Sequence, residues 1–451
     1  MEHNQMTRIC VVGAGPSGLT TTKTLLAAGL EVDCYELSPH IGGHWVIDNP
    51  SGRSSAYRSL RTNTTKRMSR FSDYEMPEDW DEFPSVDKVR EWLEAYVDRF
   101  DFRKHIQTST EIISAVPRPG GGWQVTLRAG DEAPVVRTYD AVIAASGSYW
   151  DPQQPAFTGR FNGDILHAQT YRDPHTPVDT SGANTIVCGI GNTGCEIACE
   201  ISKSNAATVY LSARSGTWIM PKLVNGVAAT KNLPMAHPTD PVPPELSRLP
   251  EAEREQKLTE QASETIRQTY GAQMKEFEML GLPRAPHHPL LKRPSISQDL
   301  MDQMVSGRIH AKPDIDRLDG DHVIFTGGES VRADIIICAT GYKLSYPYLS
   351  QDIANTQDND LSLFCGIVSP AYHDLFFIGV SRPTGAFWPI AEAQAKFVAA
   401  ILTKTYTLPP AAEIRQRTGP MLNRVAMNPV LYGLALREEL ERGRTRKRAT
   451  S

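Results

Sequence analysis

The chain has 451 residues, of which 40% are hydrophobic and 22% charged, and its net charge is −5. This length allows two or three domains with sizeable cores. The slight negative charge excludes a global basic field for nucleic acid, and no apolar run approaches the roughly 20 residues that span a bilayer. The N-terminus lacks a signal-peptide pattern, and the seven cysteines form neither a C-x-x-C pair nor part of a metal-ligand set. We therefore expect a cytoplasmic protein with no metal site, no membrane association and no nucleic-acid partner.

The first predicted unit has the order strand, glycine turn, helix, strand. The apolar run RICVV enters the turn GAGPSG, and a helical pattern and a second strand, EVDCYE, follow. In this context Gly13 permits the tight turn, Gly15 lets the backbone approach a pyrophosphate, and Gly18 lets the helix pack on the strand. The helix N-terminus offers free N–H groups to the phosphates. Glu36, at the end of the second strand, is placed to accept hydrogen bonds from a ribose diol.

A second unit of the same kind follows the apolar run TIVC. Its turn, GIGNTG, places Gly189, Gly191 and Gly194 at the same spacing, and the next strand leads to Arg214. No acid stands where Glu36 stands in the first unit. An acid would repel a 2′-phosphate, whereas an arginine can pair with it through two hydrogen bonds. The first site therefore suits a nucleotide with a free ribose diol and the second suits NADPH, with a solvated surface charge as the alternative for Arg214.

Strand-like segments flank the second unit on both sides, so we expect one nucleotide-binding domain interrupted by another. The predicted fold class is α/β with two Rossmann-like dinucleotide-binding domains. The outer domain would comprise residues 1–160 and 325–451, including C-terminal helices, and the inserted domain residues 161–324. Residues 220–300 are proline-rich and then helical. We expect them to be an insertion packed on the surface, and covering the active site or mediating dimerisation are the alternatives.

Two dinucleotide sites in one chain indicate electron transfer between a bound FAD, in the outer domain, and an exchangeable NADPH, in the inner one. A disulfide as the electron acceptor would need a redox cysteine pair beside the flavin. The segment after Glu36 has no cysteine, and the inner domain has no C-x-x-C. Oxygen is the other destination for the electrons.

The chain resembles the flavin-containing monooxygenases over nearly its whole length. Residues 161–171, FNGDILHAQTY, resemble the identifying motif F-x-G-x-x-x-H-x-x-x-(Y/F) of that family. The segments GAGPSG, GGHW, LRTNTTKRMSRFSDYEMP, GIGNTG, LSARSGTW, ATGY and SRPTGAFWPIAEAQAKF occur in the family's order. The related Baeyer–Villiger monooxygenases usually have Trp at the last motif position, where this chain has Tyr171.

This resemblance implies a reaction. NADPH would reduce FAD, the reduced flavin would react with oxygen to give a C4a-hydroperoxide, and a soft nucleophile would take the distal oxygen. The expected partners are thus O2 and a small molecule oxygenated at nitrogen or sulfur, and homodimerisation is left open. Baeyer–Villiger oxidation of ketones and an NADPH oxidase activity that releases peroxide are the alternatives.

The resemblance also assigns residues. Asn63 matches the family's asparagine near the flavin and the oxygen intermediate, which makes it the expected catalytic residue. Trp45 would pack near the flavin, and Gln394 matches a position close to the flavin ring. His167 would bond near the nicotinamide nucleotide, or serve as a hinge histidine with local bonds only. The remaining expected cofactor contacts are Pro16, Ser17, Gly43, His44, Thr62, Asn192, Thr193, Thr340 and Gly341.

Overall fold

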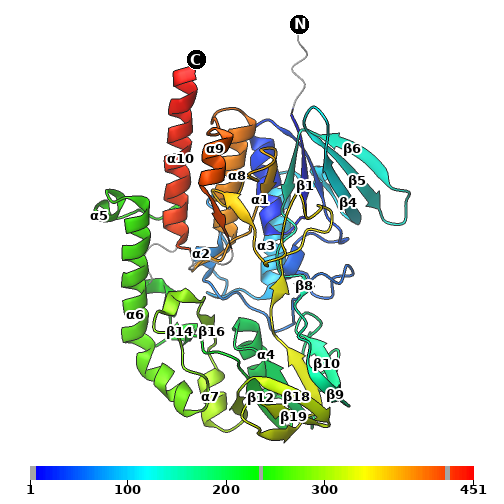
Figure 1. Ribbon diagram of the computed structural model, residues 1–451, viewed down its shortest axis with the longest axis vertical. Coiled ribbons are helices and arrows are strands. Elements are labelled where there is room, and N and C mark those ends of the chain that lie inside the picture. Colours follow the sequence, from blue (N-terminus) through cyan, green and yellow to red (C-terminus); the bar gives the residue numbers. More distant parts are fainter. Residues whose placement is uncertain (1–6, 233–236, 422–426, 451) are drawn as a thin grey trace.

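The computed structural model describes residues 7–232, 237–421 and 427–450 and contains two parallel five-stranded sheets (Figure 1). The first sheet has the order β24-β7-β1-β2-β3. Its strands are β1 (Arg8–Val12), β2 (Glu31–Tyr35), β3 (Ile106–Gln107), β7 (Ala141–Ala144) and β24 (Leu375–Phe377). The short apolar runs predicted as strands before and after the first glycine turn therefore lie side by side, in parallel.

The second sheet has the order β10-β21-β11-β12-β17. Its strands are β10 (Asp164–His167), β11 (Asn184–Cys188), β12 (Thr208–Ser212), β17 (Ile309–Lys312) and β21 (Ile335–Cys338). All of its neighbouring pairs are parallel. The predicted fold class, α/β with two Rossmann-like domains, is confirmed by these two sheets.

The pairing of β21 corrects one predicted boundary. We assigned residues 325–451 to the outer domain, but β21 lies between β10 and β11 of the second sheet. Its IIIC run is fully buried there, and the chain rejoins the first sheet only at β24. A four-stranded sheet of β9 (Thr158–Phe161), β18 (Ile315–Gly320), β19 (His322–Phe325) and β20 (Ser330–Arg332) lies beside the second sheet.

Helices cover both sheets. The first sheet packs against α1 (Pro16–Ala27), α3 (Val86–Arg99) and α8 (Trp388–Leu402), which share one apolar core with it. The second packs against α4 (Asn192–Lys203) and α7 (Leu300–Val305).

The sequence of α3 explains both its start and its packing. The Ser85 side chain caps the helix by accepting a hydrogen bond from the Lys88 backbone N–H. Apolar side chains then recur at helical spacing and are all buried: Val89, Trp92, Leu93, Tyr96 and Val97.

An antiparallel sheet of β4 (Thr110–Pro117), β5 (Trp123–Ala129) and β6 (Val135–Tyr139) projects from the first domain (Figure 1). The remaining elements are short. They are β8 (Asp151–Pro152), β13 (Ile219–Met220), β14 (Leu223–Val224), β15 (Val227–Ala228), β16 (Ser295–Ile296), β22 (Tyr342–Lys343), β23 (Ser362–Phe364), β25 (Thr418–Pro420), α2 (Lys66–Ser69), α5 (Pro244–Ser247), α9 (Ala411–Gln416) and the 3₁₀ turns Gly43–Trp45, Arg103–His105, Ala229–Asn232 and Pro289–Leu291.

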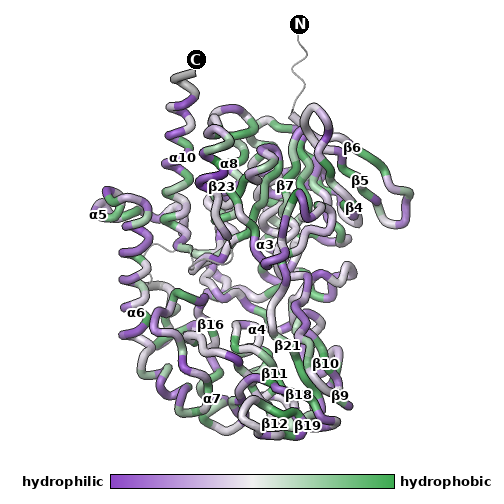
Figure 2. Tube along the Cα trace, in the orientation of Figure 1, coloured by the Kyte–Doolittle hydropathy of each residue, from purple (hydrophilic) through white to green (hydrophobic). Residues whose placement is uncertain are grey.

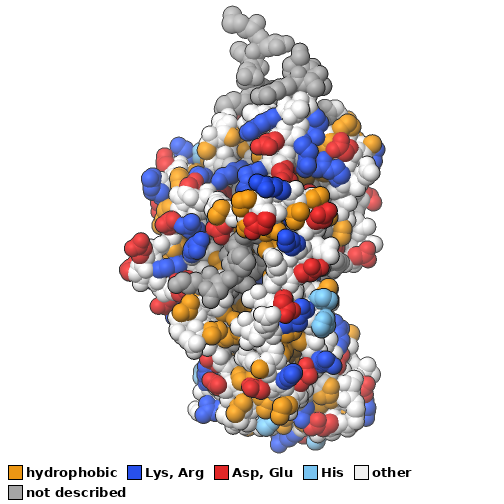
Figure 3. All heavy atoms as spheres, turned by 90° about the vertical axis from the view of Figure 1, so that its left-hand side faces the viewer, with side chains coloured by type: hydrophobic (Ala, Val, Ile, Leu, Met, Phe, Trp, Pro, Cys, Tyr) orange, Lys and Arg blue, Asp and Glu red, His pale blue; other side chains and the backbone are white. Residues whose placement is uncertain are grey.

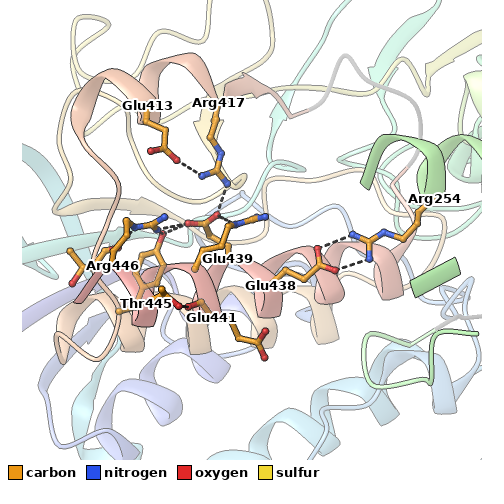
Figure 4. A network of polar contacts seen from close by, with 11 residues as sticks. Arg254, Glu413, Arg417, Glu438, Glu439, Glu441, Thr445 and Arg446 are labelled. Carbon is orange, nitrogen blue, oxygen red and sulfur yellow. Dashed lines mark hydrogen bonds and ion pairs between the residues drawn. The ribbon is translucent and has the colours of Figure 1, made fainter. Parts of the chain in front are cut away.

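Two long helices, α6 (Glu251–Met279) and α10 (Pro429–Thr450), run along one side of the molecule (Figure 1). The buried guanidinium of Arg254 on α6 donates two hydrogen bonds, of 2.7 and 2.8 Å, to the carboxylate of Glu438 on α10 (Figure 4). One helical step further, the buried Glu439 carboxylate accepts hydrogen bonds from Arg417, Arg446 and the Tyr406 hydroxyl. These contacts fix the inserted segment and the C-terminal helix to the same body.

The hydropathy of the chain follows this arrangement. Interior strands of each sheet, such as β7 and β21, are apolar, whereas α10 is apolar at its start and hydrophilic toward its C-terminal end (Figure 2). On the face formed by α6 and α10, basic and acidic side chains are interspersed (Figure 3). Within the described residues, no helix combines the length and apolar character needed to cross a membrane.

Candidate active site

The two glycine turns have nearly the same geometry. Gly13 has φ +103° and Gly189 has φ +108°, conformations that side chains other than glycine rarely adopt. A Cβ on Gly18 would lie 1.8 Å from the Gly13 carbonyl oxygen, and a Cβ on Gly194 would lie 1.9 Å from that of Gly189. Each third glycine is therefore required by the close approach of helix to strand, as its spacing predicted.

The first turn opens onto a cavity of about 170 Å³. Gly15, Pro16 and Ser17 line it, together with Glu36, Gly43 and His44. A Cβ on Gly15 would meet only ordinary contacts, the nearest being 3.6 Å from the Gly43 Cα. The packing of the protein therefore does not require glycine at position 15. A group bound in the cavity would require it, because a side chain there would occupy its space.

Glu36 lies at the end of this cavity and is buried. Its two carboxylate oxygens accept one backbone hydrogen bond each, from Ala14 (2.7 Å) and Ser38 (2.8 Å). Burial raises the pKa of Glu36, and these two N–H groups oppose the rise. Because each carboxylate oxygen can accept a second hydrogen bond, the Glu36 side chain can still accept one hydrogen bond from each of two ribose hydroxyls.

The second turn faces a larger cleft of about 480 Å³ that lies between the two sheets. A Cβ on Gly191 would meet no atom of the described chain within 4 Å. Asn192 is held by a hydrogen bond from the Ile296 backbone N–H to its Oδ1 (2.8 Å). This cleft brings together most of the residues predicted from both units: Pro16, Ser17, His44, Trp45, Thr62, Asn63, His167, Gly191, Asn192, Thr193 and Gly341.

Arg214 lies outside this cleft, two residues past β12. Its side chain is exposed, and no ion pair involves it among the described residues. The neighbouring Ser215 hydroxyl accepts a hydrogen bond from Lys292 Nζ (2.9 Å). A second cation, Lys292, is therefore bound to the residue that follows Arg214, and no sequence pattern had indicated it.

Asn63 and Thr62 carry the unsatisfied polar atoms of the cleft. Asn63 Oδ1 and Thr62 Oγ1 are buried without a hydrogen-bond partner in the described part of the chain. The loop that holds them is well fixed, because the Thr62 backbone N–H donates to the Pro84 carbonyl (3.0 Å) and Thr65 caps α2. Buried polar groups without partners are costly in a folded protein, and a bound group that satisfies them removes the cost.

His44 and Trp45 form an aromatic wall of the cleft. The His44 Nδ1 bonds with the Ser55 hydroxyl (2.8 Å), and burial lowers the pKa of His44 to about 4. The ring is therefore neutral at physiological pH. Trp45 packs edge-on against Trp388, with ring centroids 5.5 Å apart.

His167 occupies the connector between the two domains, and both of its ring nitrogens are used by the protein. Nε2 donates to the Gly341 carbonyl (3.0 Å), and Nδ1 accepts from the Gln169 backbone N–H (3.1 Å). The hinge alternative thus fits His167 better than a direct bond to a nucleotide. Gly163, in the same connector, is required by close packing, because a Cβ there would lie 2.1 Å from the Asp334 carbonyl oxygen.

Two expected contacts lie behind the cleft wall instead of on it. Gln394 is fully buried, and its Oε1 accepts from the Gly379 backbone N–H (2.9 Å) while its Nε2 donates to Tyr432. Gly379 itself lines the cleft. Thr340 donates its hydroxyl to the Gln153 carbonyl (2.6 Å), and its neighbour Gly341 lines the cleft. Gln394 thus holds the backbone of Gly379, and Thr340 holds the segment that contains Gly341. The geometry favours this positioning role over a direct contact of either side chain with a cofactor.

A further chamber adjoins Asn63, and sequence reasoning missed it. It encloses about 80 Å³. Its wall includes Leu258, Ala262 and Ile266 of α6, so the inserted segment covers the site and is not merely packed on the surface. The four-residue spacing of these apolar side chains was the available signal, because it places them on one face of a helix. Arg293 and Thr230, which also line the chamber, had no such signal.

The comparisons with known proteins decide the family. The model of the flavin-binding monooxygenase-like family matches residues 6–424. Flavin-containing monooxygenase 2 of Homo sapiens is 32% identical over 423 residues, which cover 89% of this chain and 74% of that protein. Flavin-containing monooxygenase 5 of Rattus norvegicus is 32% identical over 421 residues, covering 90% and 75%.

The chain belongs to the flavin-binding monooxygenase-like family. It is an oxidoreductase, a flavin-containing monooxygenase whose cofactors are FAD and NADPH. The first cavity of this monooxygenase fits a dinucleotide, because Gly15 leaves room for a pyrophosphate at the start of α1 and Glu36 retains capacity for ribose hydroxyls.

Solved structures support the fold of this monooxygenase. The S-allyl-L-cysteine S-oxygenase from Allium sativum aligns with a TM-score of 0.66 at 21% identity, over 91% of this chain and 80% of that one. Cyclohexanone monooxygenase from Rhodococcus sp. Phi1, in a structure bound to NADP⁺, aligns with a TM-score of 0.68 at 17% identity, over 98% of each chain.

Proposed function

We propose that this monooxygenase uses NADPH and O2 to oxygenate a nitrogen or sulfur atom of a small molecule. The observation that carries the proposal is the position of Asn63. Its unpartnered, buried Oδ1 lies where the large cleft meets the apolar chamber. In this proposal the cleft binds the cofactors and the chamber binds the substrate. The Asn63 amide is a polar group that lines both.

When FAD is bound, it supplies the redox chemistry and the activation of oxygen. The residues of the chain bind and orient the reactants. We assign Gly15 and Glu36 to binding FAD, Gly191 and Thr193 to binding NADPH, and Asn63 to hydrogen bonding beside the reacting oxygen. The Asn63 Nδ2 can donate a hydrogen bond without giving up a proton, and its unpartnered Oδ1 can accept one. The apolar chamber excludes water, which strengthens such a bond.

The relatives are consistent with attack on nitrogen or sulfur. Several of them are dimethylaniline monooxygenases that form N-oxides, such as that of Mus musculus. The Allium sativum neighbour is an S-oxygenase. A soft nucleophile held in the chamber would receive one oxygen atom, and the other would leave as water.

Baeyer–Villiger oxidation of a ketone is the second candidate, and Arg293 favours it. Its side chain lines both the chamber and the cleft and pairs with no carboxylate among the described residues. The guanidinium lies over the Phe387 ring, 5.8 Å from its centroid, and in the space that Asn63 also lines it would stabilise a negatively charged oxygen species, which that reaction needs. The cyclohexanone monooxygenase neighbours are consistent with it. Tyr171, in place of Trp, argues the other way.

A substrate screen tests the proposal. The holoenzyme would be incubated with NADPH, air and a panel of sulfides, amines, indole and ketones, with products identified by mass spectrometry and hydrogen peroxide measured in parallel. We expect sulfoxides or N-oxides formed in step with NADPH oxidation. Esters from ketones would favour the second candidate. If NADPH is converted to peroxide with every compound, the chain is an NADPH oxidase and the proposal is wrong.

A further inference from the structure

Two acidic side chains of α4 hold a segment of the first domain. Glu196 and Glu200 lie one helical turn apart and therefore on the same face of the helix. The Tyr57 hydroxyl donates a hydrogen bond to Glu196 Oε2, and the Ser59 hydroxyl donates one to Glu200 Oε2 (2.8 Å). Residues 57–59 are thus attached at two points to the helix that follows the second glycine turn.

The contact between Tyr57 and Glu196 is shielded from water, and its charge is compensated. Tyr57 is 3% exposed, and the Glu196 side chain is 18% exposed. Lys222 Nζ pairs with the other carboxylate oxygen of Glu196 at 3.0 Å. Burial and the nearby carboxylate raise the pKa of Tyr57, so its hydroxyl keeps its proton and donates. Hydrogen bonds to a charged acceptor are shorter and stronger than those between neutral groups.

One end of this contact leads to Asn63. The Leu60 backbone N–H donates to the Tyr57 carbonyl (3.0 Å), and the Leu60 carbonyl accepts from the Val86 N–H (2.9 Å). Residues 57–60 therefore form a fixed turn, and Asn63 follows it closely. Tyr57, Leu60 and Asn63 all line the cofactor cleft. A shift of Tyr57 would be passed to Asn63 through this short, hydrogen-bonded stretch of chain.

The other end leads to the nucleotide. Glu196 lies one turn after Thr193, which is assigned to binding NADPH, and both residues line the same cleft. Because a helix is a rigid element, a group that fixes the first turn of α4 also fixes Glu196. A nucleotide bound there would fill part of the cleft that Asn63 lines and exclude water from it.

We propose that the hydrogen bond between Tyr57 and Glu196 positions the Asn63 loop against the nucleotide bound at α4. This inference rests on the proposed role of Asn63, through which Tyr57 and Glu196 act as positioning residues. Without the bond, the nucleotide still binds and still reduces the flavin, but water reaches the reacting oxygen sooner. The side reaction is NADPH + H⁺ + O2 giving NADP⁺ + H2O2, in which O2 accepts both electrons and none of its atoms is transferred to a substrate.

Tyr57→Phe tests the inference because it removes only the hydroxyl. The Tyr57 ring packs edge-on against Tyr171, with centroids 6.0 Å apart, and phenylalanine keeps that packing. Tyr406→Phe is the matched control, since its buried hydroxyl also donates to a glutamate, Glu439 (2.8 Å), but in the C-terminal network. The flavin content of the holoenzymes is matched, and calorimetry gives the melting temperature and the Kd for NADP⁺ of each.

The decisive measurement is the rate at which the absorbance of oxidised flavin returns when reduced enzyme is mixed with air. The enzyme is reduced by NADPH, which leaves NADP⁺ bound, or by light without nucleotide. With NADP⁺ bound, we expect Tyr57→Phe to reoxidise about fivefold faster than the wild type, the effect of one lost hydrogen bond. Without nucleotide, the two rates should agree within about twofold, as should the Kd for NADP⁺ and the rate of anaerobic reduction.

Two controls separate positioning from a loss of stability. Tyr406→Phe should lower the melting temperature and reoxidise at the wild-type rate. Because Tyr57 acts through Asn63, adding Tyr57→Phe to Asn63→Asp should not accelerate reoxidation beyond that of Asn63→Asp alone.

Three results would overturn the inference while leaving the oxygenation intact. The first is a Tyr57→Phe enzyme that reoxidises at the wild-type rate with NADP⁺ bound. The second is an acceleration that is equal without nucleotide or in Tyr406→Phe. The third is loss of NADP⁺ binding in Tyr57→Phe, because the bond would then serve the nucleotide site alone. A wild type that converts NADPH to peroxide with every compound of the substrate screen would overturn the proposed function itself.

Discussion

At the scale of single residues, Asn63 is the side chain on which oxygen transfer should depend. Asn63→Asp keeps the size of the side chain but places a negative charge beside the reacting oxygen. Removing one preorganised donor from such a site costs about 2.7–4 kcal/mol of transition-state stabilisation, which sets an upper scale. We expect near-normal anaerobic reduction by NADPH, faster release of hydrogen peroxide and little oxygenated product. A variant that couples NADPH to product as the wild type does would show that Asn63 has no such role.

Arg214 should set the preference for NADPH over NADH. Its exposed guanidinium has no ion pair in the described structure, and Lys292 stands beside it on Ser215. An Arg–phosphate interaction contributes on the order of 1.5–3 kcal/mol, or roughly tenfold to a hundredfold. Arg214→Ala should therefore raise KM for NADPH by at least tenfold and leave KM for NADH nearly unchanged. Arg317→Ala, an exposed arginine of the same domain, is the control. An unchanged NADPH/NADH ratio would make Arg214 a surface charge only.

Gly15 offers a test of flavin binding that spares the fold. A Cβ there would make only ordinary contacts with Gly43, yet it would project into the first cavity. Gly15→Ala should thus fold normally and carry less FAD, measured as the flavin-to-protein absorbance ratio of the purified protein. Gly271→Ala, on α6, tests the substitution itself at a glycine with open space around it and no positive φ. A fully loaded Gly15→Ala protein would contradict the assignment of this turn to FAD.

At the scale of elements, sequence patterns confined to a short stretch of chain predicted the structure correctly. Both glycine turns could be predicted because strand, turn and helix follow one another within a short stretch. The strand β21 was assigned to the wrong sheet, because its apolar IIIC run fits any buried parallel strand and only pairing with β10 and β11 decides its place. The chamber could not be foreseen, since only folding brings Thr230 and Arg293 into the same wall as Asn63.

The anchoring of α10 gives a pH-dependent prediction. Burial alone would raise the pKa of Glu439, but hydrogen bonds from Arg417, Arg446 and Tyr406 lower it to about 2 (Figure 4). A carboxylate whose pKa is depressed by folding contributes stability above its ordinary pKa of about 4.5, and that stability is lost as pH falls toward 2. Denaturant unfolding at several pH values should show this loss in the wild type.

Glu439→Gln should remove that contribution. Because it leaves partly exposed arginines without their shared partner, we expect a loss of about 1–3 kcal/mol at pH 7 and a flatter profile between pH 4.5 and 2. Glu413→Gln, which breaks only a solvent-exposed pair with Arg417, should cost less than about 1 kcal/mol. Equal losses in the two variants would show that the buried network adds nothing special.

At the scale of the whole molecule, the two dinucleotide-binding domains and helix α6 all contribute walls to the cleft and the chamber that Asn63 lines. The connector is fastened to the second domain by His167, by Gly163 and by the Tyr171 hydroxyl, which donates to Glu200 on α4 (3.0 Å). Its motif is therefore explained by the attachment of the connector to the second domain, at the point where the chain enters it. The sequence motif indicated that His167 is important but could not predict its hydrogen bonds. One partner, the Gly341 carbonyl, lies far along the chain, and the other is the nearby Gln169 backbone N–H.

The central claim is that this chain transfers one atom of molecular oxygen to a small nucleophile. It is tested most directly by incubating the holoenzyme with NADPH and benzyl methyl sulfide under ¹⁸O2, and by measuring the product mass, the NADPH consumed and the hydrogen peroxide formed. The account predicts a sulfoxide that carries one ¹⁸O atom, formed at about one per NADPH oxidised. An unlabelled sulfoxide, or NADPH converted wholly to labelled hydrogen peroxide with no sulfoxide, would contradict it.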